Sequence, residues 1–149
     1  MINMRTVIKM RHFLVLFFAL FYGVTTVAKA PAGHWVTIDD KTGKKRAEIY
    51  LSVHDEVLSG KIIRVYAEHG DTGVCKGCPG AFKNQPIKDL VFLWGLKEHT
   101  DGSWGGGEIL DPKTGKVYHA KMIQKGDKLY VRGYVGVPLL GRTQIWQRI

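Results

Sequence analysis

The chain has 149 residues, the length of one domain, and 45% of them are apolar, which is too many for a disordered chain. The formal charge is +9, but residues 1–30 hold four basic side chains and no acidic one. The remainder therefore carries 18 basic and 13 acidic residues, a net charge of +5. A surplus of this size is ordinary for a soluble domain. Since nucleic-acid binding needs a concentrated basic face, we expect no nucleic-acid partner.

The N-terminal segment has the order of a secretory signal peptide. Basic residues lie among residues 5–11, residues 13–24 are almost entirely apolar, and small residues follow at residues 28–32. The apolar run is shorter than the ~20 residues that a membrane-spanning helix needs. We expect residues 1–30 to be a signal peptide cleaved between residues 28 and 32, and the protein to be periplasmic or secreted. An uncleaved N-terminal anchor is the alternative. No second long apolar run follows, so we expect no stable membrane span after signal removal.

From residue 33 onward, short β-like runs alternate with turn signals. In the second run, apolar and polar residues alternate, a period of two that is typical of a half-buried strand. Its apolar face contains Ala47, Ile49, Leu51 and Val53. The predicted strands are residues 33–38, 45–53, 57–66, 87–96, 104–110, 117–124, 129–135 and 142–148. No segment shows a sustained helical period.

Two of the connections between these runs share a sequence. Residues 41–44 and 113–116 both read Lys-Thr-Gly-Lys, each after an aspartate that can open the turn and with a glycine that can take positive φ. We interpret them as the same hairpin turn used twice. Residues 67–86 differ, because they form a long loop rich in glycine and proline, and loops of this length are often functional or specially braced.

Eight short sequential strands predict an all-β fold. We expect residues 31–149 to form a single domain, an eight-stranded antiparallel up-and-down barrel. Closure of the sheet removes the exposed edges that would otherwise promote aggregation. A barrel of eight strands can be filled by side chains or can hold one small ligand.

The first and last strands carry a recognisable pattern. Gly33 and Trp35 form a Gly-x-Trp on the first strand, and Trp146 and Arg148 lie on the last. This resembles the lipocalin and fatty-acid-binding (calycin) pattern, in which a first-strand tryptophan packs at the closed barrel end under a basic side chain of the last strand. The resemblance implies a lipocalin-like barrel with structural roles for Trp35, Trp146 and Arg148.

A closer resemblance covers nearly the whole chain after residue 32. The sequence resembles the bacterial secreted family catalogued as domain of unknown function 2147. The matching segments are residues 33–35, 39–40, 75–80, 107–112, 115–118, 131–134 and 141–146. This resemblance implies a lipocalin-like barrel in the envelope or outside the cell, and it implies no established activity.

Cys75 and Cys78 are the only cysteines of the chain, and they lie in one loop. In an oxidising compartment we expect them to form a disulfide. The closed loop is so small that the bond contributes only ~2 kcal/mol, so it would stiffen the loop rather than hold the fold. A redox pair is the first alternative, but no helix of a βαβ unit is visible. A metal site is the second, but there is no second cysteine pair. We expect no metal and no cofactor.

Large polar side chains gather on the late strands. If Trp35 and Arg148 point into the barrel, the alternation along the last strand places Arg142, Gln144 and Trp146 inside as well. A buried arginine is costly unless it is paired or ligated, which indicates a polar or anionic ligand. The candidate ligand-binding residues are Trp94, Tyr130, Arg132, Tyr134, Arg142 and Gln144. The alternatives are that these residues bond to one another or lie on the outer face.

The leading functional hypothesis is the binding of a small amphipathic or anionic molecule outside the cytoplasm. The alternative is an envelope interaction protein with a filled barrel that works through the loop of Cys75 and Cys78. We expect no enzymatic activity, because the sequence lacks both the Gly-x-Ser-x-Gly of hydrolases and the complete phosphate-loop spacing. The oligomeric state stays open.

Overall fold

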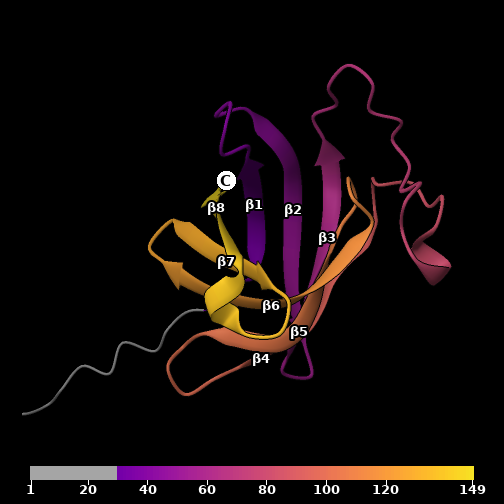
Figure 1. The fold of residues 1–149 in the computed structure, drawn as a ribbon. Helices are drawn as coiled ribbons and strands as arrows, with labels where there is room; N and C mark the ends of the chain where they lie inside the picture. The colour runs from indigo at the N-terminus through magenta and orange to yellow at the C-terminus, as the bar shows by residue number, and fades with distance from the viewer. Residues whose placement is uncertain (1–29) are drawn as a thin grey trace, which may run out of the picture.

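The computed structural model describes residues 30–149, which form one closed antiparallel barrel (Figure 1). Each strand pairs with the next along the chain, and β8 closes the barrel against β1. The predicted up-and-down order is therefore confirmed. The predicted signal peptide lies outside the described residues. Among residues 30–149, no helix is long and apolar enough to cross a membrane. The strands are β1 (Gly33–Ile38), β2 (Lys45–His54), β3 (Val57–Val65), β4 (Val91–Glu98), β5 (Trp104–Asp111), β6 (Lys116–Lys125), β7 (Lys128–Tyr134) and β8 (Arg142–Arg148).

Strand β4 starts later than the sequence predicts. Ile87 and Leu90 are apolar and precede the apolar run of residues 91–94, which favours a strand, but Asp89 has a φ of 67°, and the Leu90 N–H donates to the carbonyl of Ile87. These four residues therefore form a turn that ends the long loop, and the predicted strand over residues 87–96 is wrong in its first four positions.

The two Lys-Thr-Gly-Lys turns have matching geometry, as predicted. The Asp39 carboxylate accepts hydrogen bonds from the Lys41 and Thr42 N–H groups at 3.0 and 2.8 Å. In the second turn, the Asp111 carboxylate accepts from the Lys113 N–H at 2.9 Å and from the Thr114 hydroxyl at 2.8 Å. Aspartate thus fixes both hairpins by bonding the backbone or side chain two and three residues ahead.

One end of the barrel is closed around Trp35. This side chain is fully buried, and its indole N–H donates to the carbonyl of Pro31 at 2.8 Å. The Arg148 guanidinium lies 4.4 Å from the centre of the indole ring and donates to the Gln124 side chain at 3.1 Å and to the Ala32 carbonyl at 3.3 Å. A cation over an aromatic face is attracted by its quadrupole, so Arg148 covers the closed end as the calycin resemblance implies.

Residues 66–90 connect β3 to β4 and extend beyond the end of β3 (Figure 1). Cys75 and Cys78 lie at disulfide distance within this long loop, with their Cα atoms 5.4 Å apart, so the expected pairing is confirmed. Both cysteines are buried against the β5–β6 turn. At this contact the backbone of Gly77 lies so close to Gly115 that a Cβ on Gly115 would come within 1.9 Å of the Gly77 carbonyl oxygen.

Candidate ligand-binding site

A cavity of about 1300 Å³ opens at the barrel end opposite Trp35. In an up-and-down barrel the β1–β2, β3–β4, β5–β6 and β7–β8 connections all lie at the same end, and here each of them contributes to the mouth. Ligand sites in proteins are commonly concave clefts of ~300–1,000 Å³. The space at this mouth is therefore large enough for a small molecule.

The wall of the cavity is apolar below the mouth. Its aliphatic and aromatic side chains come from six strands: Ala47, Ile49, Ile62, Val65, Phe92, Ile109, Val131 and Trp146. Trp146 is 1% exposed, and its ring centre lies 5.9 Å from that of Phe92. The Trp146 Nε1–H has no hydrogen-bond partner within the described residues. An apolar wall of this kind suits a hydrocarbon portion of a ligand.

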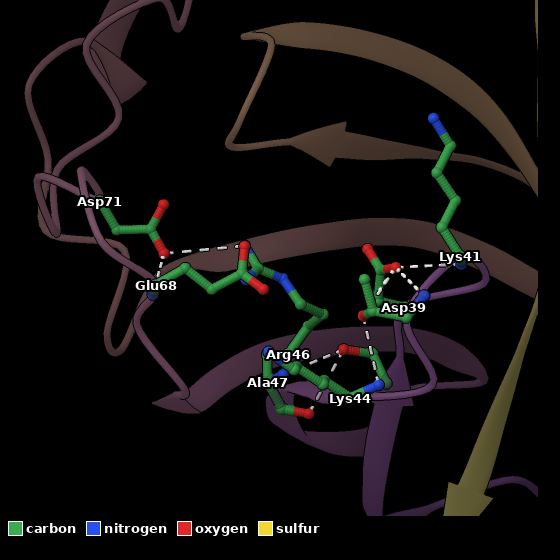
Figure 2. A network of polar contacts seen from close by, with 9 residues as sticks. Asp39, Lys41, Lys44, Arg46, Ala47, Glu68 and Asp71 are labelled. Carbon is green, nitrogen blue, oxygen red and sulfur yellow. Dashed lines mark hydrogen bonds and ion pairs between the residues drawn. The ribbon is translucent and has the colours of Figure 1, made fainter.

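Charged side chains surround the mouth, and its two arginines are paired with carboxylates. Arg142 Nη2 lies 2.5 Å from Asp40 Oδ2. Arg46 Nη1 lies 2.7 Å from Glu68 Oε2, and its Nη2 lies 3.7 Å from Asp71 Oδ2 (Figure 2). The contact at Arg46 Nη1 is an ion pair without hydrogen-bond geometry. These pairs join the first turn to β8 and anchor the start of the long loop on β2.

The remaining acidic groups at the mouth, Asp39 and Asp111, accept hydrogen bonds from residues of their own turns. The pKa of Asp39 is lowered from its ordinary value of 3.8, first by the Thr42 N–H, then by the Thr42 hydroxyl and the Lys41 N–H. Hydrogen bonds donated to a carboxylate favour its charged form. Asp111 has the corresponding bonds in the second turn.

Four lysines at the mouth have no ion-pair partner within residues 30–149. They come from three different connections and are Lys41, Lys76, Lys88 and Lys113. The hydrogen bonds from their turns leave the Asp39 and Asp111 carboxylates charged, so the cavity lining as a whole has six basic and four acidic side chains, a net charge of +2. The mouth therefore has a net positive charge above an apolar wall, and its four lysines make no ion pair within the described residues.

Three of the six predicted ligand-binding residues line this cavity. Arg142 and Gln144 lie on the inner face of β8, as the alternation from Arg148 predicts. Tyr134 contributes to the rim at the end of β7, although its position is on the outer face of the strand, where its ring lies 5.5 Å from that of His119. Arg142 is paired with Asp40 at the mouth and is not buried in the barrel. Their role in binding a ligand stays a prediction.

The other three predicted residues lie away from the cavity, which corrects their expected placement. On β7 the inward positions are Leu129, Val131 and Gly133, which pair with the inner face of β8. Because side chains alternate along a strand, Tyr130 and Arg132 face outward. The alternation of apolar Leu129 and Val131 with Tyr130 and Arg132 is a sequence signal for this orientation, which the predicted inward placement of Tyr130 and Arg132 missed.

Arg132 and Trp94 instead hold surface segments in place. The Arg132 guanidinium donates to the carbonyls of Pro138 and Leu139 at 2.6 and 3.0 Å and to the Thr143 hydroxyl at 2.7 Å. The Trp94 indole N–H donates to Glu108 at 3.2 Å, and its ring stacks on Phe82 of the long loop at 5.4 Å between centres. Tyr130 lies under the Lys125 ammonium group, 5.5 Å from its ring centre.

The lysines of the mouth were missed from the sequence, although a signal was present. Lys41 and Lys113 occupy the same position in the two repeated turns, and both turns follow odd-numbered strands. In a sequential antiparallel barrel such turns must lie at one end. The topology therefore could have placed these two lysines together, whereas Lys76 and Lys88 depend on the path of an irregular loop.

Comparison with solved structures gives a similar fold. A protein described as "Protein HP1028 from the human pathogen Helicobacter pylori belongs to the lipocalin family" is similar with a TM-score of 0.67 and 21% identity, over 79% of this chain and 82% of that one. At this identity the similarity shows the fold, which is the lipocalin-like barrel that the sequence predicts. Comparison with curated proteins finds no match. The model of the family described as "Uncharacterized protein conserved in bacteria (DUF2147)" matches residues 33–148, and the chain belongs to this family.

Proposed function

We propose that the protein binds a small amphipathic anion, with an apolar chain inside the barrel and an anionic group at the lysine-rich mouth. The observation that carries the proposal is the combination of a cavity of about 1300 Å³, an aliphatic and aromatic wall, and four lysines without an ion-pair partner in the described part of the chain. The lipocalin-like fold is compatible with this function.

The chemistry of the two parts is complementary. Apolar surface removed from water contributes about 25 cal/mol per Å², so an acyl chain along the wall supplies most of the affinity. A carboxylate, sulfate or phosphate group at the mouth would approach Lys41 and Lys113 without displacing an existing ion pair. The exposed lysines would each contribute only ~0.2–1 kcal/mol, so they select the charged head group rather than dominate affinity.

The alternative of a filled barrel is less well supported, because side chains leave the mouth half of the barrel open. Export to the periplasm or the exterior is part of the proposal and rests on the N-terminal sequence pattern.

A titration with two ligands of equal chain length tests the proposal. Laurate and dodecanol are added below their aggregation limits, and binding is followed by calorimetry and by tryptophan fluorescence. We expect laurate to bind more tightly than dodecanol, and Lys41→Glu/Lys113→Glu to weaken laurate binding about tenfold while leaving dodecanol binding unchanged. Lys125→Glu, at a turn of the closed end, is the matched control. Absence of binding by both ligands would refute the proposal.

A further inference from the structure

The loop between β7 and β8 exposes a continuous set of aliphatic side chains. Val135, Val137, Leu139 and Leu140 are 67%, 55%, 86% and 79% exposed. We call residues 135–140 the apolar loop. Single exposed aliphatic residues are normal on a protein surface, but four of them within six residues form a patch, and exposed apolar patches mark interaction sites.

The apolar loop is held in this conformation by the fold. Pro138–Leu140 form a 3₁₀ turn, and two of its backbone carbonyls accept hydrogen bonds from the Arg132 guanidinium. At the end of the loop, Gly141 packs so closely on β7 that a Cβ there would lie 2.5 Å from the Gly133 carbonyl oxygen. Leu139 and Leu140 are therefore exposed by a segment that hydrogen bonds and close packing hold in one conformation.

The apolar loop belongs to the same barrel end as the lysine-rich mouth. Val135 and Leu140 both line the cavity, together with Lys41, Lys76, Lys88 and Lys113. One end of the molecule thus combines a projecting aliphatic segment with positive charge that has no ion-pair partner in the described part of the chain. The net charge of residues 30–149 has the same sign, because they hold 18 basic and 13 acidic residues.

We propose that this end docks on a bilayer containing anionic phospholipids, with the apolar loop inserted among the head groups and the four lysines against the phosphates. Aliphatic side chains next to lysines are the composition that binds peripherally to anionic membranes, since the first bury apolar area and the second are attracted by the surface potential. Docking would turn the cavity mouth toward the membrane.

A second copy of the chain fits this surface less well. Mouth-to-mouth association would bring together two ends whose cavity linings each have six basic and four acidic side chains, and surfaces of the same net charge repel each other. The patch also lacks exposed aromatic side chains, which typically dominate protein–protein interfaces.

Vesicle sedimentation of the purified protein tests the proposal. The vesicles contain phosphatidylglycerol and phosphatidylcholine in equal parts, or phosphatidylcholine alone. We expect binding to the anionic vesicles that falls with added salt, and little binding to the neutral ones. Leu139→Asp should reduce binding about tenfold, because it replaces an inserted aliphatic group by a charge that the surface repels. Ile149→Asp is the matched control, since it changes an exposed aliphatic residue at the closed end and should leave binding unchanged.

The outcomes separate this inference from the proposed function, on which it does not rest. Leu139→Asp should bind laurate in solution as the wild type does, so a failure of laurate binding does not affect the vesicle result. Equal sedimentation of wild type, Leu139→Asp and Ile149→Asp would overturn the inference. So would a wild-type protein that ignores vesicles and forms a dimer that Leu139→Asp dissociates in analytical ultracentrifugation, because the apolar loop would then be a contact between copies.

Discussion

The two Lys-Thr-Gly-Lys turns allow the docking of the long loop to be tested with an internal control. Gly43 and Gly115 occupy the same position in the two turns and have φ values of 68° and 72°. A Cβ on Gly43 would meet nothing within 4 Å, whereas on Gly115 it would lie 1.9 Å from the Gly77 carbonyl oxygen and 2.9 Å from the Cys78 nitrogen. Substitution of either glycine by alanine therefore loses the same stability to backbone strain at positive φ. Only the substitution at Gly115 also loses stability to a steric clash.

The expected changes in the free energy of unfolding follow from these distances. Gly43→Ala should lower the free energy of unfolding by about 1–2 kcal/mol, the cost of a left-handed conformation for a residue with a Cβ. Gly115→Ala carries the same cost and must in addition displace the backbone around Gly77. We expect an additional loss of about 1–3 kcal/mol, the range of overpacking in a well-packed contact. The long loop should then separate from the β5–β6 turn, while the barrel stays folded.

Urea unfolding of the two variants measures the difference, and limited proteolysis locates it. The expected result is a lower unfolding midpoint for Gly115→Ala than for Gly43→Ala, with faster cleavage within residues 66–90 of Gly115→Ala alone. Equal stability and equal cleavage of the two variants would refute the claim that Gly77 and Gly115 fix the loop to the barrel.

Three further predictions concern the loop bond, a hairpin and pH. Cys75→Ser/Cys78→Ser should lower the free energy of unfolding by only about 2 kcal/mol and should accelerate proteolysis of the long loop; loss of the barrel's circular dichroism spectrum would contradict this. Glu56 lies in the β2–β3 turn with a φ of 62°, so Glu56→Gly should raise the free energy of unfolding by about 0.5–1 kcal/mol. A lower unfolding temperature of this variant would contradict the prediction. The pKa of Asp101 lies below its ordinary value of 3.8, chiefly because the Ser103 hydroxyl and N–H donate to its carboxylate. Its contribution to stability is thus present above the unfolded pKa and is lost as the pH falls through the folded value. We therefore expect Asp101→Ala to be less stable than wild type near about pH 6 and the difference to shrink near about pH 2, measured by thermal unfolding; a difference independent of pH would show that the bonds from Ser103 do not favour the charged carboxylate.

Most of the architecture could be predicted from local sequence because each strand has its own pattern. The alternation of Ile49 and Leu51 with polar neighbours fixes the inner face of β2, and the paired aspartate-glycine turns fix the hairpins on either side of the barrel mouth. The limits of β1 and β8 agree with the structure to the residue. The start of β4 does not, since Ile87 is half-buried and Leu90 buried in a turn whose middle residues, Lys88 and Asp89, are exposed.

The candidate site was predicted less completely, and the reasons are physical. Arg142 and Gln144 could be placed because Trp35 and Arg148 define the inner face of β8. On β7 the alternation of Leu129 and Val131 with Tyr130 and Arg132 indicates that Arg132 faces outward, but it does not show that Arg132 holds the apolar loop, which depends on the path of residues 135–140. The apolar loop itself was not anticipated, because exposure of a leucine depends on packing and not on its neighbours in sequence.

Native mass spectrometry of the protein purified from its own host's envelope, before and after addition of laurate, tests the central claim most directly. We predict a defined extra mass that is lost on denaturation and corresponds to a molecule with an apolar chain and an anionic group, and a one-to-one complex when laurate is added. A protein that carries no extra mass and takes up no laurate would contradict the claim that the cavity of about 1300 Å³ is a ligand site.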